Sequence, residues 1–295
     1  MERETIYSVR GPKTLSEMTW KEVADELKRT DLIILPVGST EEHGPHNPLA
    51  TDTIQGVEVS KRMVLKLATE GMAAVAGPPI PFGVSLHLMD FPGTITLTPA
   101  TLETLIREVC GSLIKHGFRK IVLLVSHNEN VGAVYAATQE VSQQPDVRAL
   151  VVNWAPPLRQ QYPRLLKSKS GGHGGEGETA RVLACMPELV RMERAQAYIP
   201  KSREKLDGDE PIDMGGGVLD LPHGMKEVTP IGCMGDPTVA TAETGERCYD
   251  FIVDWTCQVI KRHFNLSNNT KAGRKLGSRV KGHGSKGTGA GTRNA

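Results

Sequence analysis

Glutamate and histidine residues occur in two closely spaced pairs, each at the end of an apolar run. The run Leu32–Val37 leads into the first pair, and Lys120–Ser126 leads into the second. Within each pair the residues are two positions apart, a spacing that in extended backbone directs both side chains to the same side. An aspartate follows the first pair after a Pro-rich loop. The five residues of this pattern are Glu41, His43, Asp52, His127 and Glu129.

Imidazole and carboxylate side chains are ligands that zinc, manganese and iron accept. Five ligands exceed what one open catalytic zinc needs, and they suit two divalent ions that share a carboxylate. Asp52 is the natural bridge, because its side chain is short and it lies between the two pairs in the sequence. One such pair could be explained as helix caps and loop residues, but two pairs with an aspartate favour a metal site. We therefore predict two divalent metal ions, of zinc, manganese or iron.

A second polar cluster occupies the glycine-rich segment His173–Thr179. A histidine framed by glycines has no core to pack in, so we predict that His173 polarises a carbonyl or transfers a proton. Glu176 is predicted to act as a metal ligand or as a base. Glu178 opens a predicted helix, where it either takes part in catalysis or complements the helix dipole. His87 is a further candidate for the lining of the site.

Apolar runs alternate with amphipathic helical patterns along the chain, which is typical of a parallel sheet covered by helices on both faces. The predicted class is α/β, with three layers (α/β/α) and a mostly parallel central sheet. In such sheets ligands bind at the carboxyl ends of the strands. The predicted strands cover residues 32–37, 72–76, 120–126 and 148–154. The predicted helices cover residues 19–29, 53–70, 98–116, 131–144, 178–186 and 241–263.

The 295 residues suffice for one large domain, which we predict to span residues 1–265. Residues 266–295 are basic and rich in Gly and Ser, with almost nothing apolar, so we expect a disordered tail there. Residues 201–226 are rich in Gly, Pro and Asp, which indicates a long surface excursion. The formal net charge of +1 gives no reason to expect nucleic acid as a partner.

The five cysteines have no CxxC spacing, which indicates free thiols in a reducing compartment. The charged segment 1–14 lacks the apolar core of a secretory signal, and no apolar window is long enough to span a bilayer. We therefore expect a cytoplasmic protein that acts on a small-molecule substrate and does not bind a membrane.

Five separated motifs, in order between about residues 15 and 262, resemble those of the creatininase (creatinine amidohydrolase) family. They are Pro36–His46 with Asp52, Phe91–Thr94 (FPGT), Ser126–Asn130 (SHNEN), His173–Thr179 (HGGEGET) and Gly235–Glu243 (GDPTVATAE). The resemblance implies an α/β/α fold, a two-metal site and a homo-oligomer, often a hexamer.

By position, the resemblance also implies how the ligands divide between the two ions. One ion would be held by Glu41, Asp52 and His127, and the other by His43, Asp52 and Glu129. It further implies that His173 lies beside the substrate and that Trp154 corresponds to a tryptophan of the pocket. Most relatives with a glutamate at the position of Glu176 lack the one at the position of Glu129. Because this chain has both, one of them is free to be a base, and the sequence leaves open which.

The chain departs from the creatininases at two positions near the implied substrate. Gly172 stands where they have a glutamate, and Asn128 stands where they have an aromatic residue. Creatinine is a flat ring that gains from stacking on aromatic side chains. A pocket with Asn128, Asp90 and few aromatic residues suits a hydroxyl-rich ring better.

We predict a hydrolase in which a metal-activated water attacks a carbonyl of a small, polar, cyclic substrate and breaks an amide C–N bond. The alternative is the hydrolytic opening, at a C–C bond, of an oxidised inositol such as a dehydro-inosose. A further alternative, suggested by other members of the family, is a peptidase for a peptide-derived redox cofactor.

Overall fold

A four-stranded parallel sheet forms the centre of the computed structural model, which describes residues 11–168, 171–200 and 223–266. The strand order is β2-β1-β3-β4. The bounds are β1 Leu32–Val37, β2 Val75–Ala76, β3 Lys120–Val125 and β4 Arg148–Asn153. In register, Leu32 of β1 pairs with Lys120 of β3, which pairs with Arg148 of β4. The predicted α/β class with a parallel sheet is confirmed.

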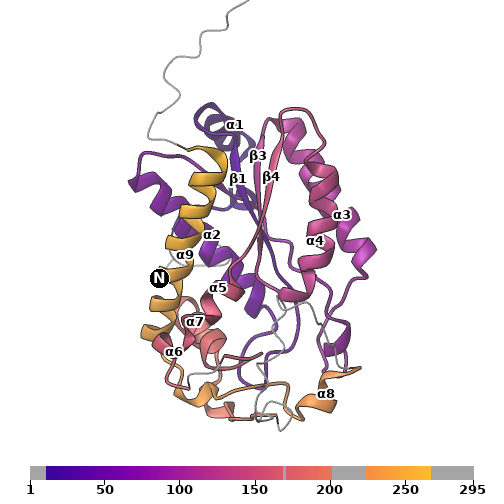
Figure 1. The fold of residues 1–295 in the computed structure, drawn as a ribbon, viewed down its shortest axis with the longest axis vertical. Coiled ribbons are helices and arrows are strands. Elements are labelled where there is room, and N and C mark those ends of the chain that lie inside the picture. Colours follow the sequence, from indigo (N-terminus) through magenta and orange to yellow (C-terminus); the bar gives the residue numbers. More distant parts are fainter. Residues whose placement is uncertain (1–10, 169–170, 201–222, 267–295) are drawn as a thin grey trace, which may run out of the picture.

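Helices cover both faces of this sheet (Figure 1). On one face lie α2 (Thr51–Thr69) and α9 (Ala242–Phe264), and on the other lie α3 (Pro99–His116) and α4 (Val131–Val141). Side chains of β1 alternate between the two cores: Leu32 and Ile34 pack with the first pair of helices, and Ile33 and Leu35 with the second. All six residues of β1 are buried, as expected for a strand with helices on both sides.

Local capping explains several helix bounds. In α1 (Trp20–Arg29), Thr19 and Glu22 form a capping box, and Thr98 and Pro99 begin α3. Gly117 ends α3 in the left-handed conformation, with φ 114°. These ends agree with the sequence predictions, and the last helix, α9, begins after Thr241 as expected.

Other bounds differ from the predictions by a few residues. Helix α2 begins two residues early, so that Asp52 lies in its first turn and not in the preceding loop. Helix α7 (Glu176–Cys185) also begins two residues early. Strand β2 is only two residues long, because the chain pairs with β1 at Val75 and Ala76 alone. Three short helices, α5 (Ala155–Arg159), α6 (Tyr162–Leu165) and α8 (Met225–Val228), were not predicted.

The predicted tail, residues 266–295, falls outside the described residues except for its first position, as does most of the predicted excursion at 201–226. Within the described ranges, no helix has the length and apolar character needed to cross a bilayer. β1 and β3 are the two central strands of the sheet. Their carboxyl ends lie at the same edge, just before Glu41 and His127 in the chain.

Candidate metal centre

Four of the predicted ligands converge on one buried spot beyond the carboxyl ends of β1 and β3. Glu41 and His43 follow β1, and His127 follows β3. Asp52 reaches the spot from the first turn of α2, where Ser39 donates a hydrogen bond of 2.7 Å to its Oδ2. The four side chains are 4% exposed or less. The structure thus brings these four of the five predicted ligands together.

Asp52 lies between the two histidines. Its Oδ1 is 3.4 Å from His43 Nε2, and its Oδ2 is 3.2 Å from His127 Nδ1. Glu41 Oε1 is also 3.2 Å from His127 Nδ1 and 3.9 Å from His43 Nε2. The geometry that a bridging carboxylate needs, one oxygen toward each side, is present in this residue.

Backbone carbonyls fix how both imidazoles face the cluster. His43 Nδ1 lies 3.2 Å from the carbonyl oxygen of Glu41, and His127 Nε2 lies 2.8 Å from that of Val84. A ring nitrogen facing a carbonyl donates its proton to it, so in the neutral imidazole that binds a metal the other nitrogen carries the lone pair. That other nitrogen, Nε2 in His43 and Nδ1 in His127, faces the carboxylates. Metal-bound histidines are oriented by such carbonyl contacts.

His43 Nε2 is buried and, among the described residues, has no hydrogen-bond partner. An orphaned nitrogen is costly unless something fills the space in front of it. A divalent cation between His43 Nε2 and the carboxylates would satisfy it and would also offset the clustered negative charge. The residues present thus fit a metal ion.

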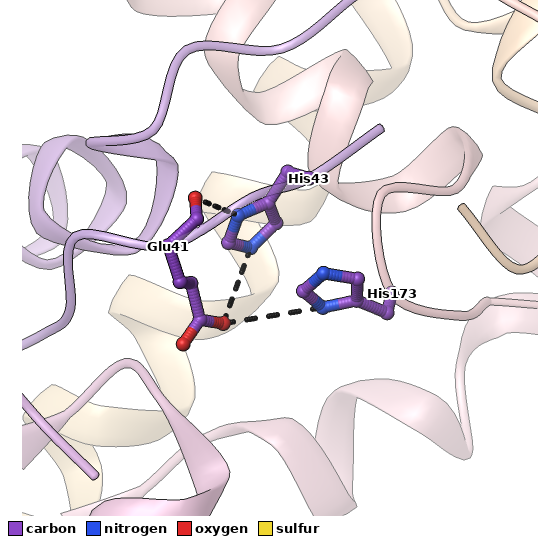
Figure 2. A group of neighbouring side chains, drawn as sticks. All are labelled: Glu41, His43 and His173. Atoms are coloured by element: carbon purple, nitrogen blue, oxygen red, sulfur yellow. Dashed lines mark hydrogen bonds and ion pairs between the residues drawn. The ribbon is translucent and has the colours of Figure 1, made fainter. Parts of the chain in front are cut away.

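Two residues of the glycine-rich segment join the cluster. Glu178, in the first turn of α7, places Oε2 at 3.7 Å from His43 Nε2, and the same oxygen accepts a 2.7 Å hydrogen bond from the backbone N–H of Gly174. His173 places Nδ1 at 4.0 Å from Glu41 Oε1, and its ring lies against that of His43 with centroids 4.3 Å apart (Figure 2).

Three overlapping groups of side chains could each hold an ion. In each group the ligand atoms lie within 4.8 Å of one another. The groups are Glu41, Asp52 and His127; His43, Asp52 and Glu178; and Glu41, His43 and His173. Glu41, His43 and Asp52 each belong to two of these groups, so the candidate ligand sets overlap.

The electrostatics of the cluster also favour added positive charge. Burial alone would lower the pKa of His43, but Asp52, Glu178 and Glu41 raise it to about 10. Burial likewise opposes the shift at His127, whose pKa the carboxylates raise well above its usual range. Burial would raise the pKa of Asp52, yet the two histidines hold it well below its usual range. Asp52 therefore stays ionised beside a positive charge, which either imidazolium or a metal ion can supply.

Two residues that sequence reasoning missed support the site. Glu42 is buried beside Glu41 and contacts His173 Nε2 twice, with its carbonyl oxygen at 2.6 Å and its Oε1 at 3.1 Å. These contacts orient the ring so that Nδ1 faces the cluster. Ser85 donates a 2.5 Å hydrogen bond to Glu41 Oε2. The adjacency of Glu42 to Glu41 was visible in the sequence, but nothing marked Ser85.

Glu129 does not join a ligand group. The chain turns into a 3-10 segment, Asn128–Asn130, directly after His127, so the extended spacing assumed for this pair is wrong. Glu129 Oε2 lies 3.3 Å from His127 Nε2, on the side of the ring away from Asp52, and Oε1 lies 3.6 Å from His87 Nε2. Glu129 and His87 thus form a pair outside the cluster.

Glu176 is fully buried, and its side chain binds backbone N–H groups. Its two carboxylate oxygens accept hydrogen bonds of 2.9 and 2.7 Å from the N–H groups of Lys167 and Ser168. Trp154 is 3% exposed and packs in the core cluster that includes residues of α9. Both carboxylate oxygens of Glu176 are thus taken by backbone N–H groups, and Trp154 lies among apolar side chains.

The remaining predicted substrate contacts lie in half-buried or exposed positions. Asn128 accepts a 3.1 Å hydrogen bond from the side chain of Asn153. Asp90 is exposed and accepts a 3.3 Å bond from the backbone N–H of Lys226 at the start of α8.

Comparison with known proteins finds relatives over most of the chain. The family model described as creatinine amidohydrolase matches residues 16–260. A mycofactocin precursor peptide peptidase of Mycolicibacterium smegmatis is 32% identical over 78% of this chain and 85% of its own length. A 3-dehydro-scyllo-inosose hydrolase of Thermotoga maritima is 28% identical, over 83% and 81% of the two chains. A creatinine amidohydrolase of Pseudomonas putida is 27% identical, over 85% and 96%.

Among solved structures, a creatinine amidohydrolase homologue from Bacteroides fragilis superimposes with a TM-score of 0.71 and 26% identity. The match covers 89% of this chain and 97% of that one. The family model and these relatives span the sheet, its helices and the metal centre. The chain therefore belongs to the creatininase family of metal-dependent hydrolases.

Proposed function

We propose that this chain is a binuclear metal hydrolase in which Asp52 bridges two divalent ions. The observation that carries the proposal is the orientation of the Asp52 carboxylate, with Oδ1 toward His43 and Oδ2 toward His127. Each of those nitrogens is the one that its ring leaves free of a backbone carbonyl. A carboxylate placed in this way can ligate one ion with each oxygen.

In this proposal one ion is held by Glu41, Asp52 and His127, and the second by His43, Asp52 and Glu178. Glu178 thus takes the ligand position that the family resemblance assigned to Glu129. The donor set of imidazole nitrogens and carboxylate oxygens is compatible with zinc, manganese or iron. When bound, two such ions would lower the pKa of a water and polarise a carbonyl of the substrate.

In this proposal His173 accepts the proton lost by the attacking water and passes it to the leaving group. Glu42 holds Nε2 of this ring, so Nδ1 is the atom that faces the cluster and transfers the proton. Glu129, whose pKa the nearby His127 and His87 lower despite its burial, remains ionised beside His87. That pair contacts polar groups of the substrate, because it lies next to His127 and outside the ligand groups.

The proposed substrate is small, polar and cyclic, and the bond broken is an amide C–N bond, as in the named activity of the Pseudomonas putida relative. A keto-inositol opened at a C–C bond is the second candidate. The position of Trp154 in the core favours this candidate, because Trp154 then offers no surface on which a flat ring could stack. The neighbours of the centre that remain are polar: His87, Glu129 and Asn128. Peptidase activity, as named for the Mycolicibacterium smegmatis relative, is the third. We place the enzyme in the cytoplasm, as a homo-oligomer.

The test is a substrate panel with the manganese- or zinc-loaded protein. Cyclic amides and formamides, keto-inositols and a C-terminal peptide substrate are compared by product formation, for the wild type and for His173→Asn. Turnover of an amide that falls at least about 100-fold in His173→Asn supports the proposal. Turnover of keto-inositols or peptides alone would replace the substrate class while keeping the metal chemistry.

A further inference from the structure

Helices α2 and α7 each carry one proposed metal ligand in the first turn and one buried polar residue a turn further on. Asp52 and Gln55 lie on α2, and Glu178 and Arg181 lie on α7. Residues three apart on a helix share a side and differ by about 4.5 Å along its axis. The second pair therefore lies one layer beneath the ligands.

The two helices are joined in this lower layer by one hydrogen bond. Arg181 Nε donates to Gln55 Oε1 at 2.5 Å. Gln55 is 1% exposed and Arg181 is 4% exposed, so the bond is shielded from water. A shielded bond to a planar guanidinium is strongly directional, and it restricts how far α2 and α7 can move apart.

The surroundings of Arg181 make a purely stabilising role unconvincing. Arg181 donates to a neutral amide, and its other polar neighbours include Tyr162 and Cys248. Among the described residues its Nη1 lacks a hydrogen-bond partner, as does Gln55 Nε2. Burying a cation is costly even with a carboxylate such as Glu178 nearby, and apolar side chains of similar volume often serve stability better. Unlike apolar side chains, this hydrogen-bonded pair fixes the direction and the length of the contact between α2 and α7.

We propose that Gln55 and Arg181 are positioning residues that set the separation of Asp52 and Glu178, and thereby the site of the second ion. The inference rests on the two-ion function proposed above. The ion held by Glu41, Asp52 and His127 does not depend on α7, since Glu41 and His127 follow strands β1 and β3. Loss of the bond is therefore expected to affect the two ions unequally.

The test is a titration of the metal-free full-length protein with Mn²⁺, in which free Mn²⁺ is followed by electron paramagnetic resonance. The wild type binds two ions. In Arg181→Met, the affinity for the second ion is expected to fall by about 10-fold or more, the usual effect of losing an outer partner of a metal site. The affinity for the first ion is expected to change by less than about twofold. Gln55→Glu keeps an acceptor for Arg181 and retains both ions.

A double variant keeps the test decisive if Arg181→Met does not fold. Arg181→Met with Gln55→Leu leaves neither polar group orphaned, so it should fold and still lose the second ion selectively. Ile252→Val, in the core on α9, is the control for general destabilisation and should retain both ions.

Two results would overturn the inference. One is a double variant that binds both ions as the wild type does, and the other is equal weakening of both ions in step with Ile252→Val. A wild type that binds fewer than two ions would instead refute the two-ion function itself, and the inference with it. The two failures are distinguishable because only the latter appears in the unmodified protein.

Discussion

Asn130 offers a direct test of how the loops around the centre are held. It is fully buried, its Oδ1 accepts a 2.9 Å hydrogen bond from Val84 N–H, and its Nδ2 donates 2.8 Å to the carbonyl of Gly38. Val84 in turn accepts the bond that orients His127, and Gly38 precedes Ser39, which bonds to Asp52. One amide thus supports two loops that orient ligands.

Asn130→Ala would remove the partner of the N–H of half-buried Val84 and of the C=O of buried Gly38. A buried orphaned group costs about 1–3 kcal/mol and a half-buried one less, so we expect the free energy of unfolding to fall by about 1–4 kcal/mol. The assay is urea denaturation of the metal-free protein, followed by tryptophan fluorescence, with the m-value checked for constancy. Metal affinity should fall as well, because His127 loses a fixed acceptor.

Gln144→Ala, an exposed amide just beyond α4, is the matched control and should change stability by less than about 0.5 kcal/mol. If Asn130→Ala loses less than about 1 kcal/mol and binds metal as before, the loops are held by other contacts. The claim that backbone contacts orient the histidines would then be wrong.

Three further predictions concern the ligands, the helix packing and pH. Glu178→Gln should remove one ion from the loaded protein whereas Glu129→Gln keeps both, as measured by metal content; equal loss in the two variants would contradict the ligand assignment. A Cβ on Gly245 would lie 2.0 Å from the carbonyl oxygen of Ala180 in α7, whereas one on Gly111 meets nothing within 4 Å. Gly245→Ala should therefore destabilise by at least about 1–3 kcal/mol, and Gly111→Ala should stabilise by about 0.5–1 kcal/mol, in urea denaturation. The raised pKa of His43 stabilises the metal-free fold fully below its ordinary pKa of 6.5, and this contribution is lost as the pH rises toward about 10. Calorimetry should show the Tm of the metal-free protein falling over that range more than the Tm of the loaded protein, since an ion replaces the proton; parallel curves would oppose this.

Much of the fold could be predicted because the central strands β1 and β3 are buried on both faces. Runs such as Leu32–Val37 are apolar throughout and end at residues that mark a turn. In α3, Thr98 is the N-cap and Gly117 is the C-cap. The start of α2 was missed because Thr51 and Asp52 resemble a cap before a helix. In the structure they form its first turn, with Ala50 as the cap and no side-chain capping bond.

The candidate site was predictable where ligands follow strands and less so where they depend on the path of a loop. Glu41, His43, Asp52 and His127 needed only strand ends and one loop to be brought together. Glu129 was misplaced because an alternating pattern cannot foretell that the chain turns into a 3-10 segment after His127.

Contacts between distant segments had no local signal at all. Ser85 reaches Glu41 across 44 positions, and Gln55 meets Arg181 across 126. A glutamine and an arginine within amphipathic helices look like surface residues until the packing of α2 against α7 is known. Such contacts depend on tertiary structure and not on spacing along the chain.

The central claim is that Asp52 bridges two ions, and the metal content per chain tests it most directly. We would measure bound zinc, manganese and iron by mass spectrometry for the purified wild type and for Asp52→Ala, after loading and removal of free metal. The account predicts close to two ions per chain in the wild type and a sharp loss of both in the variant, because each ion loses a ligand. A wild type with no bound metal, or a variant that retains two ions, would contradict it.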